Sequence, residues 1–385
     1  MKKIGILTFH RPINYGAYLQ AFSLSERLKK DFPDCHVEII DYMPKKEKKK
    51  IYINVLRTVK HEGVSGGIRD LKKICAFRRS YKHLSLSKHI PYNKDLNCLY
   101  SYINQNYDML IIGSDAVFNW NQNGYPTEFI PDYKFNIPVV SYAASVHGLK
   151  FFDEAKERIT QCERTFDSMS YIGVRDRTTG DFVKFCSPQS EPVHCCDPTF
   201  IIDKEKLEVH ARKFESNFPI KEKYIVIMAP DSTLAKSIAQ KYKDKYKIVA
   251  VFKNSKYADQ FLYNLDPFEW ANVLKNASCV ITSYFHGTLL SLVQGTPVIA
   301  LDYSSYTSEQ YEGKLRDLMV SRLALPELFY EGEYANEFSE DVSFWNTFDA
   351  LLSGSYSDRI NSAVEKEKAE FEQFSKQISN ILQIK

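Results

Sequence analysis

Short apolar runs of the kind that form buried β-strands recur along this chain, and most are followed by a segment with helical spacing. Between residues 18 and 30, apolar side chains stand at positions 19, 22, 24 and 28, which is typical of a helix. Alternation of this kind predicts parallel sheets covered by helices. The predicted strands are Ile4–Phe9, Val37–Tyr42, Met109–Ile112, Val139–Ala143 and Tyr171–Val174, followed after a break by Tyr224–Met228, Lys247–Phe252, Cys279–Ser283 and Pro297–Leu301.

The break in this pattern, at residues 197–218, indicates two domains, and 385 residues is more than one ordinary core supports. We predict an N-terminal α/β domain at 1–200, a C-terminal α/β domain at 201–345, and a helix within 346–385 that packs back on the first domain. Two Rossmann-type doubly wound domains with a central cleft and a returning C-terminal helix make a GT-B-like fold. In open parallel sheets, ligands bind beyond the carboxyl ends of the strands, so the residues after each strand are the site candidates.

Positive charge is concentrated between Pro44 and Lys94, where fifteen Lys and Arg accompany three Asp and Glu, although the whole chain carries only +3. This segment is either a solvated basic excursion or a patch that meets an anionic membrane surface or a pyrophosphate-linked substrate. In the second case we expect Arg78, Arg79 and Lys82 near the lipid. No nucleic-acid recognition motif accompanies the charge, so no nucleic-acid partner is expected.

No apolar run approaches the roughly 20 residues that span a bilayer, and Ile4–Phe9 is too short for a signal peptide. We therefore expect a cytoplasmic protein. If the basic segment meets lipid, we expect the protein to bind peripherally at the inner face of the plasma membrane. Neither a Cys/His cluster nor a carboxylate cluster has metal-site spacing, and GxGxxG and Walker A motifs are absent. We expect no metal and no bound cofactor.

Two strand ends in the first half carry small or turn-forming residues. Asn14, Tyr15 and Gly16 precede a predicted helix, whose N-terminal amides could hold an anion while Gly16 lets a ligand approach; the alternative is a plain turn. Ser145 closes a run of small residues that either leaves room for a ligand or permits tight packing.

Two further strand ends carry charged or aromatic groups. Asp115, Asn119 and Trp120 combine a carboxylate, an amide and an indole, which suits a sugar; the alternative is a capped turn with a buried tryptophan. Arg175 follows Tyr171–Val174 and is able to bind phosphate or carboxylate through two nitrogens. Its alternative is a structural salt bridge with Asp176 or another segment.

The strongest candidate is the segment from Ser283 to Thr288, between a buried strand and a helix N-terminus. His286 at this position is suited to act as a general acid and to bind an anion together with the helix amides. Ser283, Tyr284 and Thr288 add hydroxyls, and Gly287 is expected to let the substrate approach. The alternative is a histidine that only caps the helix.

Six blocks, in order, resemble the polysaccharide pyruvyl transferase family and cover about residues 4–320. The resemblance implies a GT-B-like enzyme that moves an enolpyruvyl group from phosphoenolpyruvate, the co-substrate, to a sugar of a bacterial capsule or exopolysaccharide precursor. The products are a pyruvate ketal and phosphate, and the acceptor is commonly lipid-linked or an oligosaccharide. The blocks are NYGAYLQAFSL at 14–24, LIIGSDAVFNW at 110–120, SYAAS at 141–145, VRD at 174–176, CDPTF at 196–200 and SYFHGTLLSLVQGTPVIALDY at 283–303.

The resemblance also implies roles for residues. The family's arginine looks like Arg175 and its histidine like His286, and we expect Arg175, the amides after His286 and the turn at residues 14–17 to bind the anionic groups of phosphoenolpyruvate. The first domain is expected to be the acceptor side and the second the phosphoenolpyruvate side. Many members carry an arginine where this chain has Tyr284, and some carry a lysine near 304–310, where this chain has none. His10-Arg11, Lys314 and Arg316 are the candidate replacements.

The mechanistic hypothesis makes His286 the acid that protonates the methylene or the departing phosphate, and Asp115 the group that orients or deprotonates the acceptor hydroxyl. Two alternatives remain open. One is a GT-B glycosyltransferase that uses a nucleotide sugar, with Glu269 or Glu309 at the ribose. The other is a non-catalytic protein of glycan assembly.

Overall fold

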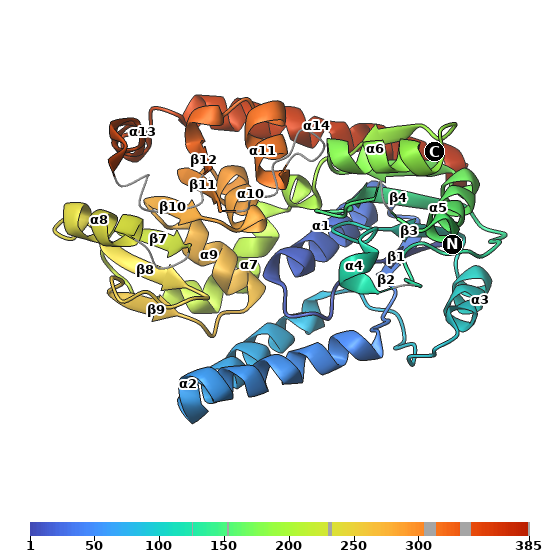
Figure 1. Cartoon of the computed structure of the whole chain (residues 1–385), viewed down its shortest axis with the longest axis horizontal. Coiled ribbons are helices and arrows are strands. Elements are labelled where there is room, and N and C mark those ends of the chain that lie inside the picture. The colour runs from blue at the N-terminus through green and yellow to red at the C-terminus, as the bar shows by residue number, and fades with distance from the viewer. Residues whose placement is uncertain (125, 152–153, 230–232, 304–312, 332–339, 384–385) are drawn as a thin grey trace. The chain divides into compact units, whose positions relative to one another are not determined.

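The computed structural model describes residues 1–124, 126–151, 154–229, 233–303, 313–331 and 340–383, with the side chains of residues 45 and 46 left out (Figure 1). These residues divide into two compact units. The first comprises Met1–Arg57, Tyr81–Ile202 and Lys368–Lys385, and the second comprises Thr58–Ser80 and Asp203–Glu367. Each unit is an α/β domain built on one parallel sheet of six strands.

The sheet of the first unit has the strand order β2-β1-β3-β4-β5-β6, and its helices connect strands that run in the same direction. Its central strands are buried throughout because both faces are covered, which is why they read as continuous apolar runs in the sequence. The elements are β1 Lys2–Leu7, α1 Tyr15–Asp31, β2 Cys35–Ile39, α3 Leu96–Asn106, β3 Met109–Ile112, α4 Trp120–Asn123, β4 Val139–Ala144, α5 Lys156–Ser168, β5 Tyr171–Val174, α6 Arg177–Cys186 and β6 Pro192–His194.

The second unit has the strand order β12-β11-β10-β7-β8-β9, also parallel, with β10 between β11 and β7 near the middle. The elements are α7 Lys204–Ser216, β7 Tyr224–Met228, α8 Thr233–Tyr242, β8 Lys247–Val251, β9 Gln260–Leu262, α9 Pro267–Lys275, β10 Cys279–Thr282, α10 Phe285–Gln294, β11 Val298–Asp302, α11 Lys314–Arg316, β12 Phe329–Glu331 and α13 Val342–Leu352. Two Rossmann-like α/β domains confirm the predicted fold class.

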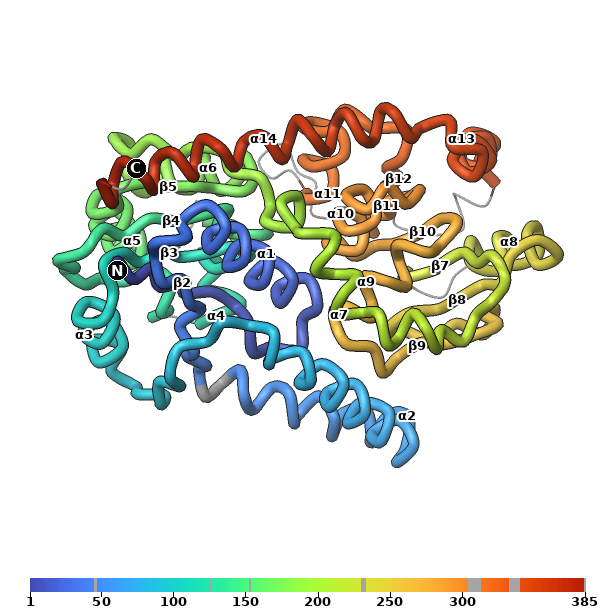
Figure 2. The backbone as a smooth tube through the Cα atoms, turned by 180° about the vertical axis from the view of Figure 1, so that it is seen from behind, coloured from blue at the N-terminus to red at the C-terminus, as the bar shows by residue number. Residues whose placement is uncertain are grey.

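The basic segment after β2 is a helical hairpin, α2 Lys45–Arg79, whose two runs lie side by side in both views (Figures 1 and 2). The helix breaks at Gly63, where φ is 73° and ψ is −174°, a backbone conformation that L side chains rarely adopt. The runs approach closely at Gly67, where an added Cβ would lie 2.3 Å from Val59 Cγ2. The sequence did not predict this long helix, because its lysines and arginines suggested a solvated excursion.

The last helix, α14 Ser357–Leu382, contacts the first unit through its C-terminal part. The rings of Phe371 and Phe374 lie 5.5 and 4.4 Å from the ring of Tyr142, measured between centroids. The observed division differs from the predicted boundaries in two places: residues 58–80 belong to the second unit, and so do residues 346–367.

The described helices include none that is both long enough and apolar enough to cross a membrane.

Candidate functional site

Four adjacent strands of the first sheet, β3 to β6, end in polar residues that meet at the carboxyl edge. Arg175, directly after β5, lies at the centre, and its side chain is only 3% exposed. Its Nη1 atom is 3.5 Å from Asp115 Oδ1 and 3.2 Å from Asp197 Oδ2, and its Nε atom is 4.0 Å from Asp176 Oδ2. The topology of the sheet therefore brings together the predicted residues Asp115 and Arg175.

The charge of Arg175 is directed at carboxylates of its own domain. Burial opposes the charged form, but Asp115, Asp197 and Asp176 outweigh it and raise the pKa of the guanidinium. Asp197 also accepts a hydrogen bond of 2.5 Å from Gln20 Nε2 in α1. The predicted alternative for Arg175, a salt bridge within the chain, is therefore what the structure contains.

The other candidates at this edge are also engaged with protein groups. Ser145 Oγ donates to Asp176 Oδ2 at 2.6 Å, and Asn119 caps α4 while its Nδ2 donates to the carbonyl of His147 at 2.8 Å. Trp120 is 2% exposed and donates from Nε1 to Glu154 Oε1. These contacts leave Asp115, with 15% of its side chain exposed, as the most accessible of the acceptor-side candidates after the exposed Asn14.

The turn after β1 forms a conventional helix start. Asn14 is the N-cap of α1, and its Oδ1 accepts from the N–H of Ala17 at 3.2 Å. Tyr15 and Gly16 are buried within the first turn of α1. The expectation that Gly16 precedes the helix was therefore wrong, because α1 begins at Tyr15, and contact of Gly16 with a ligand stays a prediction.

His10 and Arg11, proposed as replacement cations, both bind Asp41. His10 Nε2 lies 3.1 Å from Asp41 Oδ1, and Arg11 Nε donates to the same oxygen at 2.8 Å. Burial alone would raise the pKa of Asp41, but these two bonds and the nearby charges hold it well below its usual range. This pair is thus accounted for by a carboxylate of the first unit.

The end of β10 in the second unit is arranged differently. Tyr284 occupies the N-cap position of α10, yet no side chain caps this helix, and the tyrosine is 44% exposed. His286 is half-buried in the first turn, its ring edge-on to Phe285, and Ser283 is also half-buried. The first N–H groups of a helix have no acceptor within it, and its N-terminus is electropositive. The segment therefore combines an electropositive helix end with an imidazole ring, and its use as an anion site stays a prediction.

Two predicted members of this segment serve packing. A Cβ on Gly287 would lie 2.5 Å from Met228 Cε and 2.8 Å from Thr282 Oγ1, so this glycine lets α10 approach the sheet. Thr288 is fully buried, and its hydroxyl donates to the carbonyl of Tyr284 at 3.3 Å. This glycine therefore permits close helix–sheet contact, and its approach by a substrate stays a prediction.

One lysine of the second unit contacts this segment directly, and a second lies against a ring that contacts it. Lys314 Nζ is 5.3 Å from the ring centroid of Phe285, the residue before His286. Lys73 Nζ, from α2, is 5.0 Å from the ring of Phe252, and that ring is 6.2 Å from the ring of Tyr284. Lys314 was among the predicted replacements, whereas Lys73 was missed because only the fold of α2 brings it near.

Burial lowers the pKa of Lys73, although Asp70 partly opposes this effect. An anion bound nearby would stabilise the charged ammonium group of Lys73 and so offset the effect of burial. Arg316, another predicted replacement, pairs with Glu331. Residues 304–310, where some relatives carry a lysine, and Glu309 lie outside the described residues.

Two glutamates in the domains have distinct surroundings. Glu128 in the first unit is 6% exposed, and burial raises its pKa to about 7, so it can exchange a proton near neutrality. No sequence signal marked it. Glu269, the proposed ribose-binding carboxylate, instead completes a capping box with Asp266 at the start of α9.

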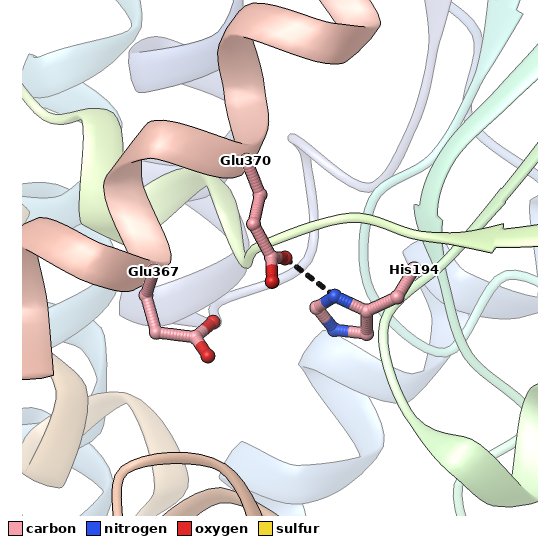
Figure 3. Close-up of side chains that lie close together, drawn as sticks. All are labelled: His194, Glu367 and Glu370. Atoms are coloured by element: carbon pink, nitrogen blue, oxygen red, sulfur yellow. Dashed lines mark hydrogen bonds and ion pairs between the residues drawn. The ribbon is translucent and has the colours of Figure 1, made fainter.

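Figure 3 shows the group most similar to a metal site in the described residues: His194, Glu367 and Glu370. His194 Nδ1 lies 2.5 Å from Glu370 Oε2, and its Nε2 lies 2.9 Å from the carbonyl of Arg175. Glu367, one helical turn earlier in α14, pairs with Arg322. All three side chains therefore have protein partners, and the absence of a metal stays a prediction.

The two six-stranded parallel sheets, each covered by helices, define two Rossmann-like α/β domains. A UDP-GlcNAc 2-epimerase from Neisseria meningitidis, solved with UDP-GlcNAc, has a similar fold: TM-score 0.56, 11% identity, 100% of both chains covered. The 2-epimerase of Methanocaldococcus jannaschii gives a TM-score of 0.52 at 13% identity, covering 91% of this chain and 93% of that one. These likenesses show the GT-B-type fold alone.

The sequence profile of the polysaccharide pyruvyl transferase family matches residues 14–305, more than half of the chain. The chain belongs to this family. No protein with a curated description matches it in sequence.

Proposed function

We propose that this protein transfers the enolpyruvyl group of phosphoenolpyruvate to a sugar in a polysaccharide precursor, forming a pyruvate ketal and releasing phosphate. Membership of the family supports the transfer to a glycan. The observation that carries the rest is the uncapped start of α10, with His286 in its first turn and Lys314 and Lys73 nearby. Phosphoenolpyruvate brings a phosphate and a carboxylate, so its binding requires such an anion site.

The phosphate binds at the amides of the first turn of α10, beside the hydroxyls of Ser283 and Tyr284. Lys314 and Lys73 supply the positive charge that the family places at the position of Tyr284. This assignment keeps the whole anion site within the second unit, on elements that the sheet holds in place. The acceptor belongs to the first unit, where Asp115 is accessible at the carboxyl edge.

The reaction balances without a redox partner. Two acceptor hydroxyls bond to C2, the C2–O bond to phosphate breaks, and the phosphate leaves with its bridging oxygen. Of the two hydroxyl protons, one ends on C3, which becomes a methyl group, and the other on phosphate. His286 is the acid that delivers a proton to C3 or to phosphate, and Asp115 receives one from the acceptor.

Arg175 acts in this scheme as a positioning residue. It is buried, and its contacts with Asp115 and Asp197 fix the carboxylate that meets the acceptor. Asn119, Trp120 and Ser145 support the same strand ends through their own hydrogen bonds.

The test is phosphate release from phosphoenolpyruvate with a panel of aryl or lipid-linked galactosides, glucosides and N-acetylmannosaminides. We expect His286→Ala to lower kcat by about 10²–10⁴-fold, the usual contribution of a positioned acid. Tyr284→Phe should affect turnover much less, because the amides of the first turn of α10 hold the phosphate and the Tyr284 hydroxyl only lies beside it. His61→Ala, at an exposed histidine of α2, is the matched control.

Turnover by His286→Ala equal to that of His61→Ala would remove His286 as the acid. If the protein released no phosphate with any acceptor but consumed a nucleotide sugar, the pyruvyl transfer itself would be excluded. The second outcome would favour a glycosyltransferase on the same fold.

A further inference from the structure

The α2 hairpin carries an exposed apolar stripe on each of its two helical runs. In the first run Tyr52, Leu56 and Val59 follow one another at spacings of four and three residues, and in the second run Val64, Ile68 and Leu71 do the same. Residues at this spacing share one face of a helix. All six side chains are exposed, Leu56 to 68% and Val64 to 70%.

This concentration is specific to α2. Among the described residues, thirteen large hydrophobic side chains are exposed, and seven of them, these six and Ile53, belong to this one element. The other six are scattered, as single apolar residues on protein surfaces normally are. Contiguous exposed apolar side chains on one element mark an interaction surface instead.

The same element carries twelve Lys and Arg against three Asp and Glu. Lys48, Lys49, Arg57, Lys60 and Lys72 are exposed beside the stripes. A strongly basic partner surface, including a second copy of this hairpin, would be repelled. Nucleic acid would match the charge but not the apolar side chains.

We propose that α2 docks this protein on an anionic lipid bilayer, with the two stripes inserted at the level of the headgroups and the flanking cations against anionic lipid. An amphipathic helix of this composition binds in the interface plane through its apolar face and its basic residues together. The second run also carries Lys73 toward Phe252 in the second unit. The lipid contact therefore lies on the element that supplies a cation to the anion site.

The surface differs from the one that the sequence alone suggested. Arg79 Nη2 lies 3.8 Å from Glu269 Oε2, and the other end of the hairpin, around Gly63, is where the exposed apolar residues lie. The docking surface is therefore centred on residues 52–72 and not on Arg78, Arg79 and Lys82.

The experiment is flotation of the full chain with two kinds of vesicle. One is phosphatidylcholine alone, and the other contains about 30 mol% phosphatidylglycerol, which imitates an anionic cytoplasmic leaflet. We expect at least about tenfold more binding to the anionic vesicles, declining with salt. Leu56→Ser/Val64→Ser/Ile68→Ser and Arg57→Glu/Lys60→Glu/Lys72→Glu should each abolish most of it. Phe185→Ser/Val209→Ser/Val342→Ser and Lys204→Glu/Arg212→Glu/Lys213→Glu, at exposed sites elsewhere, are the matched controls.

A Val64→Trp variant adds a direct readout of insertion: its emission should shift to the blue on anionic vesicles and be quenched by brominated acyl chains. The proposal is overturned if the chain does not bind anionic vesicles, or if the apolar triple variant binds as well as its control. It is also overturned if the intact protein is a dimer in solution that the apolar triple variant dissociates. None of these readouts depends on catalytic activity, so they stand apart from the proposed reaction.

Discussion

The carboxyl edges of the two sheets hold the same kind of residues in opposite states. In the first unit, Arg175 is buried among three aspartates, and Ser145 and Asn119 have hydrogen-bond partners within the domain. In the second unit, α10 begins without a side-chain cap, Tyr284 is exposed, and His286 is half-buried. At the first edge most polar side chains are engaged with groups of their own domain and Asp115 keeps 15% of its side chain exposed, whereas the second edge offers an electropositive helix end.

A polar residue that follows a strand can therefore have either of two roles, one structural and one in ligand binding. A buried charge surrounded by opposite charges stabilises the arrangement that holds it and is costly to remove. An uncapped helix N-terminus is stabilised when a ligand supplies the missing negative charge. The comparison therefore predicts that mutations at the first edge, apart from Asp115, act mainly on stability and that mutations at the second edge act mainly on substrate binding.

The largest effect is expected for Arg175→Ala. Its removal leaves Asp115, Asp176 and Asp197 facing one another in a buried setting, which should lower the free energy of unfolding by about 3–5 kcal/mol. Chemical denaturation measures it, with exposed Arg177→Ala as the control, expected within about 0.5 kcal/mol of the native chain. An Arg175→Ala protein of native stability with a greatly raised KM for phosphoenolpyruvate would instead make Arg175 a substrate ligand.

Glu128 tests whether every buried carboxyl group of the first unit is stabilised in its charged form by neighbouring groups. Its pKa in the folded chain is about 7, above the ordinary 4.5, so between these values the folded state keeps a proton that the unfolded state has lost. Stability therefore falls as the pH rises through this window, by up to roughly 3 kcal/mol above pH 7.

Glu128→Gln removes that titration, so the variant should be more stable than the native chain at pH 8 and nearly equal to it at pH 4.5. Denaturation across this range, with exposed Glu157→Gln as the control, measures the difference. Parallel pH profiles for the Glu128→Gln and native proteins would mean that the carboxyl is compensated after all.

Gly287→Ala probes the fit of α10 against the second sheet. Because the new Cβ would meet Met228 Cε at 2.5 Å, we expect a loss of about 1–3 kcal/mol in stability, together with weaker phosphoenolpyruvate binding as the first turn shifts. Combining it with Met228→Ala should recover part of the loss, which a double-mutant cycle detects. Additive effects in that cycle would show that the contact with Met228 does not limit the helix position.

The smallest effect is expected at the lysines near α10. Lys73→Ala and Lys314→Ala should each raise the KM for phosphoenolpyruvate roughly tenfold, about 1.4 kcal/mol, with a smaller change in kcat. Lys72→Ala, one residue away and exposed, is the matched control, and Lys73→Arg should keep most of the affinity. Equal KM values for the Lys72→Ala and Lys73→Ala variants would mean that Lys73 does not replace the arginine of the family.

The strands were predictable because buried parallel strands are continuous apolar runs: Met109–Ile112, Tyr171–Val174 and Tyr224–Met228 match the structure residue for residue. The three-residue strands β6, β9 and β12 were missed, since edge strands this short carry little periodic signal. The α2 hairpin was missed because most of its large apolar side chains are exposed, and its buried apolar side chains, Ile74, Ala76 and Phe77, lie only near its end.

The candidate site residues could be placed at strand ends from the sequence, because the order of strands along the chain determines which residues follow each strand. It could not say which of them were already engaged. The partners of Trp120 and Arg175, namely Glu154 and Asp197, lie 34 and 22 residues further along the chain. Likewise, only the folded hairpin brings Lys73 to Phe252.

The division of the chain into two units has a consequence during its synthesis on the ribosome. Residues 58–80 are made early but belong to the second unit, whose next segment begins only at Asp203. At about 5–20 residues per second, this piece waits roughly 6–24 s for its neighbours. Like charges along a nascent segment keep it extended and hinder aggregation. We therefore expect the lysines and arginines of α2 to oppose association with other chains until the rest of the second unit has been synthesised.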